Sequence, residues 1–131
     1  MFQLDIKTSA ARELVDITSS LRKSITDSKV REGLAVVYCP HTTGAITINE
    51  GADPDVCRDI NVNLTHLVPG SGDYHHAEGN SDAHIKSSLV GCSETVIISN
   101  GQPVLGTWQK LFFAEFDGPR TRKAYVKIIQ G

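Results

Sequence analysis

The expected fold rests on GLAVVYCPHTTGAITIN, residues 33 to 49. Gly33 to Cys39 is rich in β-branched and aromatic residues and has apolar side chains on both faces, which predicts a central strand buried on both sides. Residues 40 to 44 predict a turn that holds His41. Residues 45 to 49 then predict a strand that runs back antiparallel to the first.

The residues before this stretch predict two strands and a short helix. Residues 2 to 6 alternate between apolar and polar, which is the period of a half-buried strand, and residues 13 to 18 are a weaker strand candidate. We expect these two strands to pair antiparallel. Leu21 and Ile25 lie one helical turn apart after a serine cap and predict an amphipathic helix that fades at residues 27 to 29.

Two more helices are expected in the middle of the chain. Residues 53 to 55, Asp-Pro-Asp, place a capping aspartate, a proline at the first helical position and an acid in the first turn. Apolar residues follow at helical spacing as far as Leu67. A shorter helix is predicted over residues 81 to 91, where Ile85 and Leu89 share one face.

The last third of the chain predicts strands. Residues 94 to 99 and 103 to 106 flank Asn100-Gly101, the dipeptide best suited to a type I′ hairpin. Residues 111 to 116 and 123 to 129 predict two further strands. Because no repeat or linker interrupts the pattern, we expect one α+β domain of mainly antiparallel sheet or sandwich with two or three helices.

Composition and charge exclude several classes of protein. The 131 residues suit a single domain, residues 1 to 131, and 40% hydrophobic with 21% charged residues is typical of a soluble globular protein. A net charge of −2 offers no broad basic face for nucleic acid. With no secretory signal and no apolar run long enough for a membrane span, we expect a cytoplasmic protein without a membrane partner. Cys39, Cys57 and Cys92 form no C-x-x-C pair and are expected to be reduced thiols.

Three of the five histidines cluster in DYHHAEGNSDAHIK, residues 73 to 86. His75, His76 and His84, with nearby acids, could ligate zinc or another divalent metal, or could be incidental side chains of a solvated loop. His84 would fall in the first turn of a helix. There the helix dipole favours a neutral imidazole, and free N–H groups can accept a phosphate.

The acidic block of residues 39 to 55 is separated from the histidine that precedes it. His41 and Thr42 lie at one end of a predicted strand, whereas Glu50, Asp53 and Asp55 lie at the other, roughly 17 Å away. The two ends cannot meet in one pocket within that strand. The three carboxylates could hold magnesium, although Asp53 and Asp55 are also what a helix start requires.

Two other segments offer candidate binding residues. Trp108 could be a core residue or a platform that stacks on a heteroaromatic substrate, whose polar edge Gln109 could read. Arg120, Arg122 and Lys123 cluster on a predicted turn, where such groups are usually solvated but can also bind phosphate. No nucleophile elbow, P-loop or G-x-G-x-x-G motif occurs.

Four blocks in this order, PHTTGAITINEGADPDV, LVPG, NSDAHIKSSLVG and LGTWQ, together resemble the YjbQ family (UPF0047), whose members are also called secondary thiamine-phosphate synthases. The resemblance runs along nearly the whole chain. It implies a compact homotrimer and a transferase that joins a pyrimidine methyl diphosphate to a thiazole phosphate and releases pyrophosphate. Because His41 and Glu50 lie at opposite ends of a strand, a trimer could complete each site between two subunits.

The resemblance and the side-chain chemistry together assign roles to residues, with Arg120 and Lys123 chosen for their positive charge. The expected catalytic residues are His41, His84, Glu50 and Arg120. The expected substrate-binding residues are Thr42, Asn80, Trp108, Gln109 and Lys123. The expected ligands of a divalent metal, zinc or magnesium, are His41, His76, His84, Asp53 and Asp55. Two alternatives stay open: a trimer that binds metal or a small phosphorylated ligand without catalysis, and a metal-assisted phosphate hydrolase.

Overall fold

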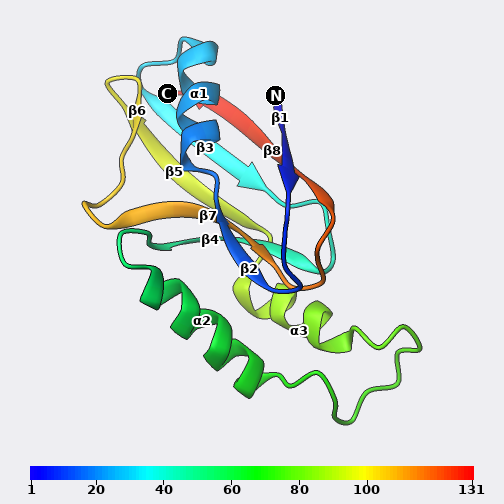
Figure 1. The fold of residues 1–131 in the computed structure, drawn as a ribbon. Coiled ribbons are helices and arrows are strands. Elements are labelled where there is room, and N and C mark those ends of the chain that lie inside the picture. The colour runs from blue at the N-terminus through cyan, green and yellow to red at the C-terminus, as the bar shows by residue number, and fades with distance from the viewer.

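The structure is a computed structural model that describes residues 1 to 131 (Figure 1). The strands are β1 (Phe2–Lys7), β2 (Glu13–Asp16), β3 (Gly33–Tyr38), β4 (Gly44–Glu50), β5 (Ser93–Ser99), β6 (Gln102–Pro103), β7 (Gln109–Glu115) and β8 (Thr121–Gln130). The helices are α1 (Thr18–Ser28), α2 (Pro54–Leu67) and α3 (Ser81–Val90). The strands form two antiparallel sheets, one ordered β1-β8-β3-β5-β6 and one ordered β2-β7-β4. The predicted α+β class is therefore confirmed.

The three-stranded sheet lies in the middle of the molecule. One of its faces packs against the inner face of the five-stranded sheet and α1, and this main core contains Leu21, Val37 and Phe113 with no exposed surface (Figure 1). Its other face packs against α3, where Ala83 and Ala114 belong to a smaller core. This arrangement places the start of α3 beside the β3–β4 segment and the β7–β8 turn.

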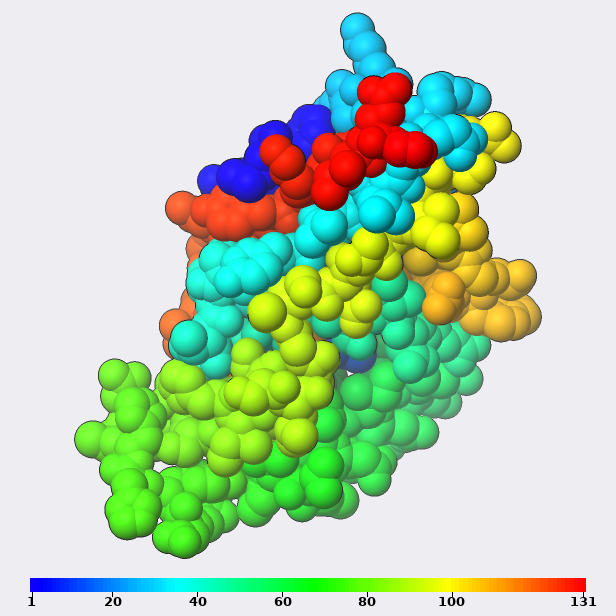
Figure 2. All heavy atoms as spheres, turned by 180° about the vertical axis from the view of Figure 1, so that it is seen from behind, coloured from blue at the N-terminus to red at the C-terminus, as the bar shows by residue number.

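β3 is the central strand of its sheet, but the prediction that it is buried on both sides is wrong. Ala35 and Val37 face the core, whereas Leu34 is 39% exposed and Tyr38 is 46% exposed. No helix covers the outer face of this sheet, and Figure 2 shows its strands at the molecular surface. The strand covered on both faces is β7, in which Leu111 to Glu115 are all buried.

Two of the predicted strand pairs, that of the first two strands and that of β3 with β4, are also wrong. β1 pairs with β8 and β2 with β7, so the first two strands lie in different sheets. β4 pairs with β7 rather than with β3. The β4–β7 ladder continues one position beyond Gly44, where the Phe116 N–H donates to the Thr43 carbonyl at 3.2 Å. The segment between β3 and β4 therefore crosses from one sheet to the other.

Local signals predicted the start of α2 and the hairpin correctly, whereas the side-chain caps expected at the starts of α1 and α3 are absent. The Asp53 carboxylate accepts from the Asp55 N–H at 2.9 Å and caps α2, with Pro54 at its first position. Asn100 and Gly101 have φ angles of 53° and 72°, as the β5–β6 hairpin requires. None of the three helices is long and apolar enough to cross a membrane.

α3 packs through small residues, not through its two large apolar ones. Ile85 and Leu89 share a face as expected, but that face is exposed. Ala83 and Ser87 lie against β4, where the Ser87 hydroxyl donates to the Gly44 carbonyl at 2.6 Å. A close approach of helix and strand explains the choice of small side chains.

Candidate functional site

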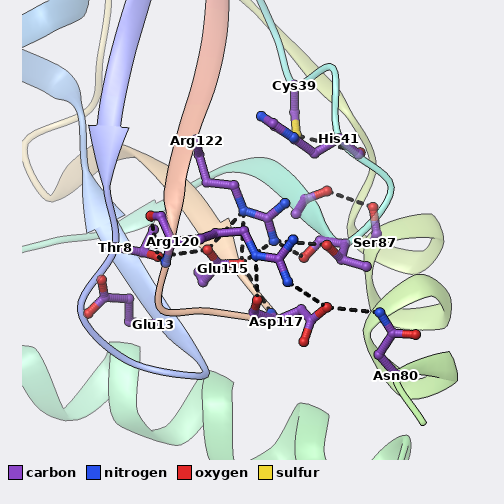
Figure 3. Close-up of polar contacts among 12 residues, drawn as sticks. Thr8, Glu13, Cys39, His41, Asn80, Ser87, Glu115, Asp117, Arg120 and Arg122 are labelled. Atoms are coloured by element: carbon purple, nitrogen blue, oxygen red, sulfur yellow. Dashed lines mark hydrogen bonds and ion pairs between the residues drawn. The ribbon is translucent and has the colours of Figure 1, made fainter. Parts of the chain in front are cut away.

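A polar cavity of about 310 Å³ lies between the β3–β4 segment, the start of α3 and the β7–β8 turn. Apart from Pro40, every residue that lines it carries a polar side chain. The lining residues are Pro40, His41, Thr42, Thr43, Glu78, Asn80, His84, Asp117, Arg120 and Arg122. Figure 3 shows that these elements bring their polar side chains together from distant parts of the chain.

One wall of the polar cavity is built on a buried ion pair. Arg122 is 2% exposed and Glu115 has no exposed surface. Arg122 Nε donates to Glu115 Oε1 at 2.9 Å, and its Nη2 contacts the other carboxylate oxygen. Nη2 also donates to the Thr43 hydroxyl at 2.8 Å. These contacts hold the Arg122 guanidinium in place between Glu115 of β7 and Thr43 of the β3–β4 segment.

Further donors complete the environment of Glu115. The Thr8 hydroxyl donates to Oε1 at 2.7 Å, and the Asp117 N–H donates to Oε2 at 3.1 Å. Burial alone would raise the pKa of this carboxyl, but the hydrogen bonds from Arg122, Thr8 and Asp117 outweigh burial and hold the pKa below its usual value. Glu115 is therefore ionised, and both of its carboxylate oxygens already accept hydrogen bonds from within the protein.

His41 is held in one tautomer by a backbone contact. Its Nε2 accepts from the Lys123 N–H at 2.9 Å, so the neutral ring carries its proton on Nδ1. Burial lowers the pKa of His41, and the Arg122 charge lowers it further against the opposing effect of Glu115. The ring also lies edge-on to Phe113. His41 thus offers a neutral N–H donor to a ligand.

The opposite side of the polar cavity contains a second network. Asp117 Oδ2 accepts from Asn80 Nδ2 at 2.8 Å and from Arg120 Nη2 at 3.0 Å. Asn80 Oδ1 is buried and has no hydrogen-bond partner. Because a buried acceptor without a donor is costly, this oxygen is suited to a ligand that carries a hydrogen-bond donor.

His84 lies where the polar cavity meets two adjoining hollows of about 380 and 480 Å³. Its ring centroid is 5.3 Å from that of His76, and His76 Nε2 is 3.8 Å from Glu78 Oε2. The His75 side chain is 95% exposed and contacts Asp73 alone. Of the adjacent pair, His76 is therefore the histidine that lies near the polar cavity.

The predicted metal ligands do not form one group within the chain. His41 and His84 line the polar cavity, and His76 lies beside His84. No three His, Cys, Asp or Glu side chains are arranged to hold a metal ion. The structure thus gathers nitrogen and oxygen donors around the polar cavity without a preformed metal centre, and the metal ligands stay a prediction.

The acidic block lies at the far end of β4, as its spacing predicts. Glu50 is opposite Gln109 in the β4–β7 ladder, and Asp53 caps α2 just beyond. Trp108 is 62% exposed, so it is not a core residue. The Gln109 side-chain oxygen accepts from the Gly106 N–H at 2.7 Å. None of these residues lines the polar cavity, which holds His41 at the other end of the strand.

Of the remaining expected site residues, Thr42, Asn80 and Arg120 line the polar cavity. Lys123 contributes through its backbone, since its N–H fixes His41 while its side chain is exposed. Within one chain, the structure therefore brings together the histidine, threonine, asparagine and arginine candidates and leaves the acidic and tryptophan candidates apart.

Sequence reasoning missed the buried pair at the centre of the site. Arg122 was expected to be a solvated or phosphate-binding residue of a turn, but it lies in β8 and is buried. Its signal was the alternation of Arg122, Ala124 and Val126, which places the arginine on the core face of the strand. Glu115 gave a comparable signal as a lone acid within the apolar run of residues 111 to 116.

Known proteins match this sequence along nearly its whole length. A family model described as "UPF0047 protein YjbQ-like" matches residues 2–131. A UPF0047 protein of Methanocaldococcus jannaschii is 61% identical over 129 residues, which cover 98% of this chain and 94% of the relative. The UPF0047 protein YugU of Bacillus subtilis is 47% identical, with 96% of each chain covered.

Solved structures give the same result. A YjbQ/UPF0047 protein of Clostridium acetobutylicum superposes with a TM-score of 0.97 at 56% identity, over 98% of this chain and all of the other. A YbjQ-like protein from Sulfolobus solfataricus, described as of unknown function, superposes with a TM-score of 0.95 at 28% identity, over 99% of this chain and 96% of the other. The chain therefore belongs to the UPF0047 family of YjbQ-like proteins.

Proposed function

We propose that the polar cavity binds the diphosphate of a small substrate and that the protein is a metal-dependent transferase of the thiamine-phosphate synthase type. The observation that carries this proposal is the convergence of His41, His84 and Arg120 in a cavity lined almost entirely by polar side chains. Imidazole N–H and guanidinium groups are donors that match phosphate oxygens. The family resemblance supplies the specific reaction, the joining of a pyrimidine methyl diphosphate to a thiazole phosphate.

The chemistry of this reaction suits the side chains at hand. The bond between the pyrimidine methyl carbon and the diphosphate oxygen breaks, and the lone pair of the thiazole nitrogen forms the new carbon–nitrogen bond. That nitrogen carries no proton, so no general base is required. The protein needs to orient the two substrates and to neutralise the pyrophosphate that leaves. Arg120 and the Nδ1–H of His41 supply donors for this purpose.

The charge balance of the polar cavity supports a role for a divalent cation. Arg122 is paired with Glu115, and Arg120 is paired with Asp117. The lining also contains Glu78, so the fixed charges leave no net positive charge for a diphosphate. Magnesium usually binds one or two carboxylates together with water and phosphate oxygens. We infer that magnesium enters with the diphosphate. Glu78, Asp117 and His84, which line the polar cavity, are its candidate side-chain ligands.

We also propose that the site is completed between subunits of a homotrimer. Support comes from the acidic end of β4, where Glu50 and Asp53 accompany an exposed tryptophan that no part of the same chain covers. Further support comes from Ile85 and Leu89, which form an exposed apolar strip on α3 beside the histidines. A head-to-tail contact between such surfaces would bring one subunit's acids near another's polar cavity.

The first experiment separates the transferase from its alternatives. The protein is incubated with the two thiamine precursors and magnesium, and products are identified by mass spectrometry. Thiamine phosphate and pyrophosphate are expected, whereas release of the pyrimidine alcohol would identify a hydrolase. Binding of pyrophosphate in calorimetry without any product would identify a binding protein. No binding and no product would refute the proposed function.

Single variants test the residues. Removal of one donor from a charge-stabilising site lowers kcat by about 10²-fold, and we expect a loss of this order for Arg120→Ala and His84→Ala. His75→Ala is the matched control, because its side chain lies almost wholly in solvent beside the same loop. Equal losses for His75→Ala and His84→Ala would contradict the assignment.

Mixed trimers test the shared site. Chains carrying His84→Ala are mixed with chains carrying Glu50→Ala, and a shared site predicts partial recovery of activity because some interfaces regain both residues. A site built within one chain predicts no recovery. Light scattering of the unmixed protein establishes the trimer itself.

A further inference from the structure

Two of the three cysteines lie opposite each other at the end of a strand pair. The β3–β5 register pairs Val37 with Glu94 and Tyr38 with Ser93, so the next position along pairs Cys39 with Cys92. The Cys39 N–H donates to the Cys92 carbonyl at 2.7 Å, which confirms that the pairing continues. Directly opposed residues of an antiparallel ladder project to the same side.

The spacing of this pair is compatible with a disulfide. Cα atoms of directly opposed antiparallel residues are about 4.5 to 5.5 Å apart, and disulfides join residues whose Cα atoms are roughly 4.4 to 6.8 Å apart. Both cysteines are free thiols in the structure. The Cys39 thiol donates to the His41 carbonyl at 3.7 Å, so it lies on the segment that forms the cavity wall.

The two thiols differ in access. Cys92 is exposed and lines the 480 Å³ hollow with His41 and His84, whereas Cys39 is buried. An oxidant therefore reaches Cys92 first, and Cys39 is placed to act second as the resolving thiol.

We propose that Cys39 and Cys92 form a peroxide-sensitive pair that closes into a disulfide at the edge of the candidate site. The Cys92 thiol gives up its proton, its sulfur attacks one oxygen of hydrogen peroxide, the O–O bond breaks to leave a sulfenic acid, and the departing hydroxide takes up the released proton as water. The Cys39 sulfur then attacks the Cys92 sulfur, the S–O bond breaks, and the departing hydroxide takes the Cys39 proton as water. In sum, two thiols and one peroxide give one disulfide and two waters.

The bond would join the two segments that carry the site histidines. His41 follows Cys39 by two residues, and Cys92 directly follows the Gly91 that ends α3, the helix of His84. Oxidation also removes the thiol proton that Cys39 donates to the His41 carbonyl. We infer that the redox state of the pair sets how His41 is held relative to α3. This inference does not depend on the proposed transferase activity.

The test is thiol mapping of the native protein. Reduced protein is treated with hydrogen peroxide, remaining thiols are alkylated after denaturation, and peptides are mapped without reduction. The expected result is a linked Cys39–Cys92 peptide pair that dithiothreitol releases, with Cys57 recovered in alkylated form. Recovery of alkylated Cys39 beside a Cys92 oxidised to sulfinic or sulfonic acid, or linked to another chain, would overturn the proposal.

Variants supply matched controls. Cys57→Ser is expected to leave the linkage unchanged, because Cys57 lies on α2 and contacts the Glu50 carbonyl instead. Cys39→Ala should leave a Cys92 sulfenic acid that dimedone traps. In NMR spectra, the His41 C2–H signal should move on oxidation of the native chain and stay in place in Cys92→Ser. An unmoved signal in the oxidised native chain would overturn the link to the site.

Discussion

The two ends of β4 differ in how their polar side chains are held. At the Gly44 end, Arg122 and Glu115 are buried and bound to each other and to neighbouring hydroxyls. At the Glu50 end, Asp53 caps its own helix, and the neighbouring tryptophan lies largely in solvent. The first end is organised by contacts between distant parts of the chain, and the second by contacts within a few residues.

The side chains at the Gly44 end are preorganised by hydrogen bonds, whereas those at the Glu50 end are not. Polar groups that are already fixed lose little freedom when a ligand binds, so the Gly44 end is suited to recognition within one chain. The Glu50 end places acids and an aromatic ring on the surface without any such network. If its residues act on the same substrate, another subunit has to bring them to the polar cavity.

The largest expected effect comes from breaking the buried pair. Glu115→Gln leaves the Arg122 charge buried without its counter-charge, and loss of one partner of such a pair costs about 3–5 kcal/mol. Urea unfolding measures the loss. Glu50→Gln makes the same chemical change at the opposite end of β4, where we expect a change within about 0.5 kcal/mol. Similar losses in the two variants would remove the contrast between the ends.

A smaller effect is expected from the helix cap at the Glu50 end. Asp53→Ala removes the acceptor of the Asp55 N–H, and the loss of such a cap costs about 1 kcal/mol. Thermal or urea unfolding would detect it. Asp55→Ala serves as the comparison, because that side chain contributes charge near the helix start but no cap. A larger loss for Asp55→Ala would refute this account of the acidic block.

The pH dependence of stability gives a subtler test of the Gly44 end. The pKa of His41 is lowered in the folded chain, so the unfolded chain takes up a proton first as the pH falls. The stabilising contribution is therefore complete above the ordinary histidine pKa of about 6.5 and declines below it. His41→Asn should remove this part of the decline in unfolding experiments from neutral to mildly acidic pH. The solvated His75→Asn should not, and equal effects would contradict the assignment.

The smallest expected effect on protomer stability is that of Trp108→Ala. A tryptophan in a core costs about 3–5 kcal/mol when truncated, but one that is 62% exposed should cost within about 0.5 kcal/mol. Acrylamide should quench its fluorescence readily in the dilute protomer. A core-sized loss of stability in that protomer would show that the ring is packed within its own chain.

Local sequence signals were enough for the helices and the hairpin but not for the sheets. A cap such as Asp53 or a turn such as Asn100-Gly101 acts over a few residues, so its pattern is complete in the sequence. Strand pairing depends on which distant strand supplies backbone partners. β4 lies beside β7 and not beside β3, the neighbouring strand in the sequence.

The candidate site divides in the same way. The histidines, Thr42 and Arg120 could be chosen from the sequence, because their side-chain chemistry and the resemblance mark them. The roles of Glu115 and Arg122 could not, since their meaning depends on burial against each other. The sequence likewise did not show which face of α3 is exposed, because the helix packs through small residues and leaves Ile85 and Leu89 in solvent.

The sequence by itself determined the α+β class, the capped start of α2, the hairpin and the family, because each rests on patterns of neighbouring residues. Only the tertiary structure decided the pairing of the strands, the strand that is buried on both faces and the polar cavity. Those features depend on contacts between segments far apart along the chain. Thr8, Thr43, Glu115 and Arg122 acquire their shared role only when two strands and two connecting segments place their charges and hydroxyls within hydrogen-bond distance.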